Sequence, residues 1–196
     1  MSGPAILAFL ISYLLGSIPF GLILTRLSGK GDIRDIGSGS IGATNVLRTG
    51  SKGLAAATLL FDAAKGAVAV LLAQRLWPDA VPVAAAGALI GHLYPVWLRF
   101  KGGKGVATLL GILVPLLPMA ALVYAVVWIG LFLVVRISSV AGMTAAASAP
   151  VSAVVLNQPA LFPLLLGFAV LVIWKHRANV GRLIAGSEPR VGRAKA

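Results

Sequence analysis

The sequence predicts an all-α polytopic membrane protein with seven transmembrane helices, an outside N-terminus and a cytoplasmic C-terminus. Of its 196 residues, 59% are hydrophobic and only 11% are charged, and the mean hydropathy is +0.97. A soluble domain is about 25% charged, so this chain has too few polar side chains to cover a surface facing water. Long apolar runs alternate with short polar stretches, without a repeat of fixed period. We therefore expect a single integral-membrane domain over residues 1–196.

The apolar runs are taken as spans in chain order. The first lacks the basic segment and cleavage site of a signal peptide. In the second, Asp62 and Lys65 stand three residues apart on one helix face and can pair within the membrane. The fourth has about 14 residues, short of the ~20 that cross a bilayer, and its prolines indicate a tilt or an early end. The runs are 5–24, 53–73, 80–98, 105–118, 119–135, a run of small residues that reaches Leu156, and 159–174.

The basic residues set the orientation. With the N-terminus outside, 15 of the 17 Lys and Arg residues fall inside, Arg75 alone falls outside, and Lys65 lies within a span. Positive residues favour the cytoplasmic side, so the C-terminus is expected there. A net charge of +12 suggests anionic lipid or phosphorylated substrates rather than nucleic acid, because the charges are scattered between apolar runs. The inside set is Arg26, Lys30, Arg34, Arg48, Lys52, Arg99, Lys101, Lys104, Arg136, Lys175, Arg177, Arg182, Arg190, Arg193 and Lys195.

A glycine-rich basic stretch, FKGGKGVAT at residues 100–108, precedes the fourth run. Glycines at 102, 103 and 105 allow backbone N–H groups to converge on an anion, and the start of the next helix adds unpaired donors. Lys104 supplies a mobile charge. The stretch predicts a phosphate-binding loop, formed by Gly102, Gly103, Lys104 and Gly105. It is not a Walker A loop, because neither Ser nor Thr follows the lysine. The alternative is an ordinary basic turn at the membrane surface.

A second polar stretch, GSGSIGATNVLR, occupies residues 37–48. Ser38, Thr44 and Asn45 offer neutral hydrogen-bonding groups, and Arg48 offers a guanidinium fork that can grip phosphate. The alternative is a flexible linker. Interleaved apolar residues are unusual in such linkers, so the pattern favours a functional loop.

The remaining polar residues have two interpretations each. His92 lies late in the third run without a carboxylate nearby in sequence, which favours a structural histidine. Ser139 opens the sixth run, either as a helix cap or as a substrate contact. His176, Arg177 and Asn179 follow the last run and suit a phosphate or hydroxyl group, or anchor the chain at the membrane interface.

The chemistry available to these residues is limited. No carboxylates have the spacing of a catalytic dyad, neither histidine is followed at the fifth position by aspartate, and no Gly-x-Ser-x-Gly elbow occurs. There is no cysteine and there are two histidines, so we expect neither a metal nor a cofactor. Such a set binds phosphate and stabilises negative charge. It suits a donor that is already activated, such as an acyl phosphate, whose own oxygens can accept a proton.

Together these stretches resemble the bacterial acyl-phosphate:glycerol-3-phosphate acyltransferase family, the PlsY type. The matching segments are YLLGSIPFG (13–21), GSGSIGATNVLR (37–48), GHLYPVWLRFKGGKGVAT (91–108), Arg136 with Ser139, and HRANVGRLIAGSE (176–188). Two positions depart from the family pattern. Ser40 replaces the usual asparagine and has a shorter reach, and Gly142 stands where serine or alanine is usual.

The resemblance implies an inner-membrane enzyme whose site faces the cytoplasm. It implies transfer of a fatty acyl group from acyl phosphate to the sn-1 hydroxyl of glycerol-3-phosphate, giving lysophosphatidic acid and phosphate for phospholipid synthesis. A linked enzyme that forms acyl phosphate is implied, and the donor phosphate itself is expected to take the proton. The loop amides at 102–105 and Lys104 would hold the donor phosphate. The family's polar site residues correspond to Ser38, Thr44, Asn45, Arg48, Lys104, Ser139, His176 and Asn179.

The competing class is a transporter for an anionic metabolite or lipid. Transporters usually place their site near the bilayer midplane, in broken helices of an inverted repeat. Here only the Asp62–Lys65 pair lies deep, and the other polar stretches are predicted on one face.

Overall fold

A computed structural model describes residues 2–191, and within that range the chain is helical without a strand. The packing divides the chain into two compact units, Met1–Leu116 and Leu117–Ala196. The prediction of an all-α protein is therefore confirmed. Two tail residues counted for the orientation, Arg193 and Lys195, lie outside the described range.

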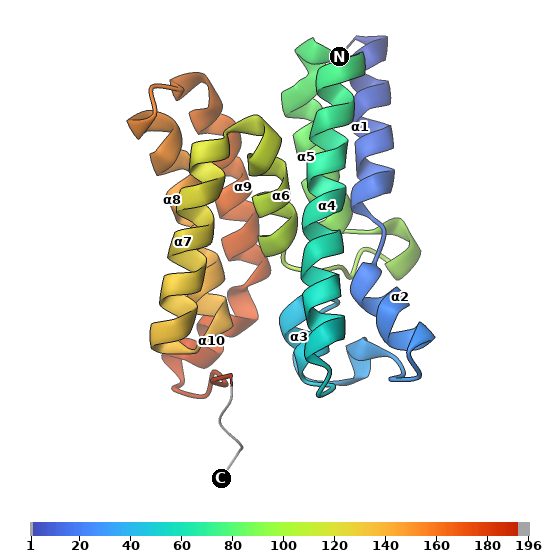
Figure 1. The fold of residues 1–196 in the computed structure, drawn as a ribbon, viewed down its shortest axis with the longest axis vertical. Helices are drawn as coiled ribbons and strands as arrows, with labels where there is room; N and C mark the ends of the chain where they lie inside the picture. The colour runs from blue at the N-terminus through green and yellow to red at the C-terminus, as the bar shows by residue number, and fades with distance from the viewer. Residues whose placement is uncertain (1, 192–196) are drawn as a thin grey trace. The chain divides into compact units, whose positions relative to one another are not determined.

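The first unit contains three long helical segments that run alongside one another (Figure 1). They are α1 (Gly3–Gly16) continued by α2 (Phe20–Leu27), then α4 (Lys52–Leu76) and α5 (Val81–Leu93). The first predicted span is broken, because the chain leaves the helix at Ser17 and resumes after Pro19, which has non-helical dihedrals of φ −90° and ψ 70°. The short helix α6 (Val106–Leu116) packs against α4.

Glycine allows the helices of the first unit to approach closely. A Cβ at Gly16 would lie 2.1 Å from the carbonyl oxygen of Ala88 where α1 meets α5, and a Cβ at Gly111 would lie 1.8 Å from that of Ala63 where α6 meets α4. Small residues at such crossings allow backbone-to-backbone packing, which drives association of helices in lipid.

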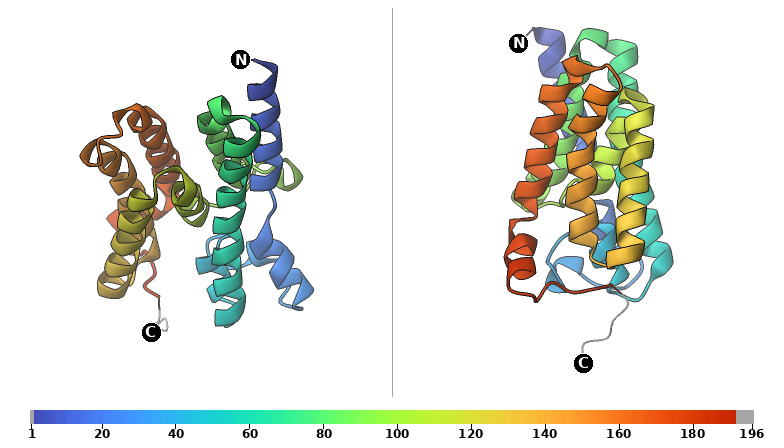
Figure 2. Two further views of the ribbon diagram at one scale, coloured as in Figure 1. Left: turned by 45° about the horizontal axis from the view of Figure 1, so that its top comes forward. Right: turned by 90° about the vertical axis from the view of Figure 1, so that its left-hand side faces the viewer.

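The second unit is a group of neighbouring helices that ends in a shorter helix (Figure 2, right). The helices α7 (Pro118–Val135) and α8 (Ser138–Val155) form a tight pair, joined through Arg136 in a left-handed conformation with φ 58°. The helix α9 (Phe162–Lys175) packs on α8, and α10 (Arg177–Ile184) follows after a bend of 58°. A stripe of small residues on α8 is buried, comprising Ala141, Gly142, Ala145, Ala146, Ala149 and Ala153.

Within the described residues, five helical segments are long and apolar enough to cross a membrane, and six if the bent α9–α10 pair counts as one span. By length and composition these segments favour the integral membrane protein that the sequence predicts. The predicted count of seven is not reproduced, because α6 has 11 residues and remains a short apolar helix. The five segments are Gly3–Leu27, Lys52–Leu76, Pro78–Leu98, Pro118–Val135 and Ser138–Val155.

Candidate active site

The polar stretch after α2 is an ordered loop. It contains a 3₁₀ turn, η1 (Ile33–Asp35), and the short helix α3 (Ala43–Leu47). Ile33, Ile41 and Val46 are buried in an apolar cluster with Leu98, which lies on the 3₁₀ turn before the glycine-rich loop. Ile41 and Val46, which are among the apolar residues that argued against a linker, are therefore anchors of this loop. The same cluster supports both polar loops of the first unit.

Asn45 is the centre of the first loop. Its side-chain amide lies within 2.8–3.1 Å of the carbonyl oxygens of Ile33, Ile36 and Ser40. Its Oδ1 accepts hydrogen bonds from the Ser38 N–H at 3.1 Å and from the Arg48 guanidinium at 3.2 Å. Asn45 is 2% exposed, and in this structure its side chain holds the loop together.

Two predicted site residues that form hydrogen bonds with Asn45 lie at the surface. Ser38 and Arg48 are both exposed and are held at its Oδ1. Gly37 makes this possible: its φ is +58°, and a Cβ there would lie 2.1 Å from the Arg48 guanidinium. The loop thus presents a hydroxyl and a guanidinium side by side. Thr44 lies half-buried on α3.

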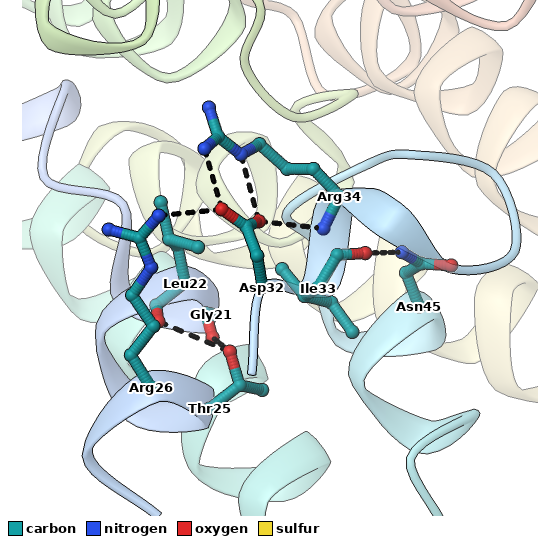
Figure 3. Close-up of polar contacts among 8 residues, drawn as sticks. All are labelled: Gly21, Leu22, Thr25, Arg26, Asp32, Ile33, Arg34 and Asn45. Atoms are coloured by element: carbon teal, nitrogen blue, oxygen red, sulfur yellow. Dashed lines mark hydrogen bonds and ion pairs between the residues drawn. The ribbon is translucent and has the colours of Figure 1, made fainter. Parts of the chain in front are cut away.

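Asp32 fixes the start of the same loop (Figure 3). Its carboxylate accepts two hydrogen bonds from the Arg34 side chain at 2.9 and 2.6 Å and one from Arg26 at 2.6 Å. The hydrogen bond from the Arg34 side chain is the main reason that the pKa of Asp32 lies well below its usual range. Two of the predicted inside arginines are thus engaged with the loop itself.

The glycine-rich loop returns against the end of α5. The N–H of Gly102 donates to the Leu93 carbonyl at 3.2 Å, and the N–H of Gly103 donates to the His92 carbonyl at 3.0 Å. These two amides therefore form hydrogen bonds within the protein in this structure. Gly105, with φ +86°, turns the chain into α6, where its carbonyl accepts the N–H of Leu109. Lys104 lies half-buried between these glycines.

Three buried polar residues lie behind this loop. Lys65 Nζ is 2.7 Å from Asp62 Oδ1, which confirms the predicted pair, and it donates to the Ile18 carbonyl at 2.8 Å. His92 Nδ1 lies 3.7 Å from the same Asp62 oxygen. His92 has no carboxylate nearby in sequence, but α4 places Asp62 next to it in the folded chain. This supports the structural interpretation of the histidine.

The second unit contains a polar cluster around Glu188. One carboxylate oxygen accepts hydrogen bonds from Ser139 Oγ at 2.6 Å and from Asn179 Nδ2 at 2.5 Å, and the other accepts from Arg182 Nε at 2.7 Å. Burial alone would raise the pKa of Glu188, but these three hydrogen bonds and the charge of Arg182 outweigh it and lower the pKa. The carboxylate thus stays ionised at neutral pH.

This cluster corrects one expectation. Ser139 does not cap α8, since the helix begins at Ser138 and the Ser139 hydroxyl reaches Glu188. In addition, no role for Glu188 was predicted from the sequence, although its short spacing from Asn179 on one polar segment was a signal that the two could meet. A strong carboxylate acceptor is therefore present next to two predicted site residues.

His176 and Arg177 have different environments. His176 is 3% exposed, and its Nδ1 lies 2.7 Å from the Val172 carbonyl at the end of α9. Arg177 is exposed, with its guanidinium 5.1 Å from the centre of the Trp174 ring. Arginine stacked on an exposed tryptophan is typical of an anchor at a membrane interface, so this alternative fits Arg177 but not His176.

The predicted site residues thus fall into two sets, one in each unit. The first unit holds Ser38, Thr44, Asn45, Arg48, Gly102, Gly103, Lys104 and Gly105, and the second holds Ser139, His176, Arg177 and Asn179. Among the described residues, no group of three or more His, Cys, Asp or Glu side chains could hold a metal ion.

Comparison with known proteins assigns this arrangement to a family. The family model described as glycerol-3-phosphate acyltransferase matches residues 6–186. The chain belongs to the glycerol-3-phosphate acyltransferase family. It is 55% identical to the glycerol-3-phosphate acyltransferase of Mesorhizobium japonicum, covering 95% of this chain and 96% of that one. It is 57% identical to the Brucella anthropi protein of the same name, covering 94% and 92%.

Solved structures place the chain in the PlsY-type branch of the family. The crystal structure of PlsY, an integral membrane glycerol 3-phosphate acyltransferase, in its glycerol 3-phosphate form matches with a TM-score of 0.91 and 38% identity, over 97% of this chain and 96% of that one. The lysophosphatidic acid form of PlsY matches with a TM-score of 0.89 and 36% identity, over the same shares of the two chains. The resemblance inferred from the motifs is thereby confirmed.

Proposed function

We propose that this glycerol-3-phosphate acyltransferase takes its acyl group from an acyl phosphate and delivers it to the sn-1 hydroxyl of glycerol-3-phosphate. The products are lysophosphatidic acid and inorganic phosphate. The observation that carries the proposal is the glycine-rich loop, where Lys104 stands between two glycines directly before α6. A full positive charge next to a helix N-terminus is suited to a phosphate group. The substrate and product named for the PlsY structures are compatible with this reaction.

The proposed transfer needs no protein base. The acceptor hydroxyl oxygen attacks the acyl carbonyl carbon, the bond from that carbon to the phosphate oxygen breaks, and the hydroxyl proton passes to an oxygen of the departing phosphate. An ester and hydrogen phosphate result, so atoms and charge balance. Lys104 stabilises the negative charge that develops on the leaving phosphate, which is an electrostatic contribution of the kind that oxyanion sites make.

The environment of Glu188 is consistent with a transfer that uses no protein base. It is an ionised carboxylate, but both of its oxygens are engaged with donors of the protein. It is therefore placed to orient Ser139 and Asn179 rather than to remove a proton from substrate. A neutral amide and hydroxyl fixed by a carboxylate are preorganised hydrogen-bonding groups, which lowers the cost of ordering them in the transition state.

We assign the remaining residues by their chemistry. Arg48, His176 and Asn179 are assigned to the phosphate end of glycerol-3-phosphate, and Ser38 and Ser139 to the acceptor hydroxyl. Thr44 and Arg177 stay expected substrate contacts, Asn45 acts by holding Ser38 and Arg48, and the glycines at 102, 103 and 105 shape the loop around Lys104.

The proposal places the enzyme in the bacterial inner membrane with its site facing the cytoplasm. Counting α6 as a span gives seven, with the N-terminus outside and the whole chain as one acyltransferase domain. The positive-inside distribution of Lys and Arg supports this orientation. An acyl-phosphate-forming enzyme would supply the donor, and membrane lipid would surround its acyl chain.

The test compares two lysines of the same loop. Lys104→Ala is expected to abolish formation of labelled lysophosphatidic acid from palmitoyl phosphate and labelled glycerol-3-phosphate, while the protein still inserts and purifies. Lys101→Ala removes an exposed charge three residues away and should retain most of the activity. Near-normal turnover in Lys104→Ala would remove the loop from the mechanism.

The same assay separates donors and function classes. Product formed with acyl-CoA but not with acyl phosphate would overturn the donor assignment. Uptake of labelled glycerol-3-phosphate into sealed vesicles without product would favour a transporter instead.

A further inference from the structure

The buried residues Asp62, Lys65 and His92 have no place in the proposed transfer. Each is at most 5% exposed and lies on a membrane-spanning segment of the first unit. Asp62 Oδ1 is their common contact, 2.7 Å from Lys65 Nζ and 3.7 Å from His92 Nδ1. Burying two full charges is costly, and apolar side chains of similar volume often give equal or better stability. The cluster therefore requires a reason beyond packing.

One edge of the cluster is in direct contact with the glycine-rich loop. A Cβ built at Gly103 would lie 2.1 Å from His92 Nε2 and 2.6 Å from His92 Cε1. The imidazole ring is thus seated flush against the backbone of the residue that precedes Lys104. The His92 carbonyl also accepts the Gly103 N–H at 3.0 Å, so both the backbone and the ring of His92 touch Gly103.

The other edge of the cluster is tied to fixed backbone. Lys65 donates to the Ile18 carbonyl in the break between α1 and α2. The next residue, Gly66, is in close contact with the beginning of α6, where its added Cβ would lie 2.4 Å from the Thr108 carbonyl. The turn before the loop is tied to the same break, because Trp97 Nε1 donates to the Ser17 carbonyl at 3.0 Å. The loop is therefore fixed by contacts at three points: at Trp97 before it, at Gly103 within it and at Thr108 after it.

We propose that His92, which lies next to the Asp62–Lys65 pair, is a positioning residue. Its ring packs against Gly103 and thereby fixes the position of Lys104. This inference rests on the proposed phosphate role of Lys104. It predicts a steric coupling between His92 and Gly103 that packing of the helices alone does not require. It also predicts that a displaced loop weakens donor binding, whereas a general loss of folded protein would leave KM unchanged.

The test uses the steric relationship directly. Gly103→Ala carries no penalty from a left-handed backbone, because the φ of Gly103 is not positive. The three atoms nearest the new methyl group all belong to the His92 ring. It should raise KM for palmitoyl phosphate and lower kcat/KM by about 10–100-fold. His92→Asn removes those ring atoms while keeping a polar group toward Asp62, and the added methyl group then has space.

The expected result is a strong coupling between the two changes. Gly103→Ala should cost less than about 3-fold in kcat/KM when it is added to His92→Asn, against at least about 10-fold in the wild-type background. The matched control is Gly102→Ala, whose Cβ meets the His92 carbonyl at 2.2 Å and Pro95 Cδ at 2.4 Å. His92→Asn leaves those atoms in place, so it should not relieve Gly102→Ala.

A second readout does not depend on activity. Amide hydrogen exchange of the segment 98–108 should accelerate in Gly103→Ala and in His92→Asn, because the loop is no longer supported. If His92→Asn does not accumulate in the membrane, His92→Ala removes the same ring atoms, and exchange in Gly103→Ala alone still reports on the contact.

Two results would overturn the inference: kinetic losses that multiply in the double variant, or loop exchange in both single variants equal to that of the wild type. Failure of the proposed function is distinguishable from either. The kinetic comparison can be run with whichever acyl donor the wild-type protein accepts, and the exchange measurement requires no donor.

Discussion

Replacing Glu188 by glutamine tests the polar cluster of the second unit most directly. The substitution keeps the size of the side chain and removes its charge. Ser139 and Asn179 still find an amide oxygen, but their hydrogen bonds lose the assistance of the carboxylate. The new amide group meets Arg182 Nε, which is also a donor. The change therefore weakens two hydrogen bonds and abolishes the third.

The magnitude follows from these contacts. A hydrogen bond to a charged group contributes about 1.5–3 kcal/mol and is roughly twice as strong as a neutral one. Losing the charge should cost about 1 kcal/mol at each of Ser139 and Asn179, with up to ~1 kcal/mol for the Arg182 pair, which is partly exposed to solvent. A total of about 3 kcal/mol corresponds to a fall in Tm of roughly 6–12 °C for a chain of this size.

The pH dependence supplies an independent check on the same residue. The pKa of Glu188 is lowered in the folded protein, so its contribution to stability is complete above the ordinary glutamate pKa of roughly 4.3. It is lost as the pH falls through the lower folded value. The Tm of the wild type should therefore drop more steeply below about pH 4.3 than that of Glu188→Gln. Asp32 titrates in both proteins, so their difference isolates Glu188.

The assay is thermal unfolding in detergent from pH 7 to pH 3, with acyl transfer measured at pH 7. Transfer by Glu188→Gln should fall by about 10²-fold, because Ser139 and Asn179 lose their fixed geometry. A variant whose Tm lies within about 1 °C of the wild type at pH 7 would refute the reasoning. The reasoning would also be refuted if the Tm difference between the wild type and Glu188→Gln were already lost at pH 5, because the contribution of Glu188 should be complete down to about pH 4.3.

Three further predictions concern the first unit. Asp62→Asn or Lys65→Met alone leaves one buried charge without its partner and should cost about 3–5 kcal/mol by thermal unfolding, while the double variant should cost clearly less than the sum; additive losses would contradict the pairing. Gly111→Ala should destabilise by about 1–3 kcal/mol by pushing α6 from α4, whereas Gly130→Ala, whose Cβ meets nothing within 4 Å, should be neutral or slightly stabilising in the same melt. Asn45→Ala removes the contacts that hold Ser38 and Arg48 and should reduce kcat/KM for glycerol-3-phosphate by at least about 10-fold; unchanged kinetics would show that the loop holds its shape without it.

Features that depend on local spacing were predicted well from the sequence. The Asp62–Lys65 pair follows from a separation of three residues on a helix, and the structure places the two groups 2.7 Å apart. The interleaved apolar residues of the stretch 37–48 correctly indicated an ordered segment, because Ile41 and Val46 are buried and anchor it. Long apolar runs likewise predicted most of the spans, since lipid demands continuous helices.

Features that depend on contacts between distant residues were missed. Glu188 meets Ser139 across 49 residues, and His92 meets Asp62 across 30 residues of sequence, so neither pairing has a local signature. The backbone partners of the loop amides were also not predicted. Glycine spacing shows that a backbone can approach something closely, but it does not distinguish a phosphate from the carbonyl groups at the end of α5, which take the N–H groups of Gly102 and Gly103.

The break between α1 and α2 has a consequence for how the protein is made. The Ser17 and Ile18 carbonyl groups within the first span accept hydrogen bonds from Trp97 and Lys65. Both donors are synthesised after this span, Lys65 47 residues after Ile18 and Trp97 80 residues after Ser17. Until they arrive, these carbonyl groups would face lipid without those partners, which costs several kcal/mol per unsatisfied group. We therefore expect the nascent first span to remain a continuous helix, or to stay close to the insertion machinery. It should adopt its broken form only when α4 and the turn after α5 pack against it.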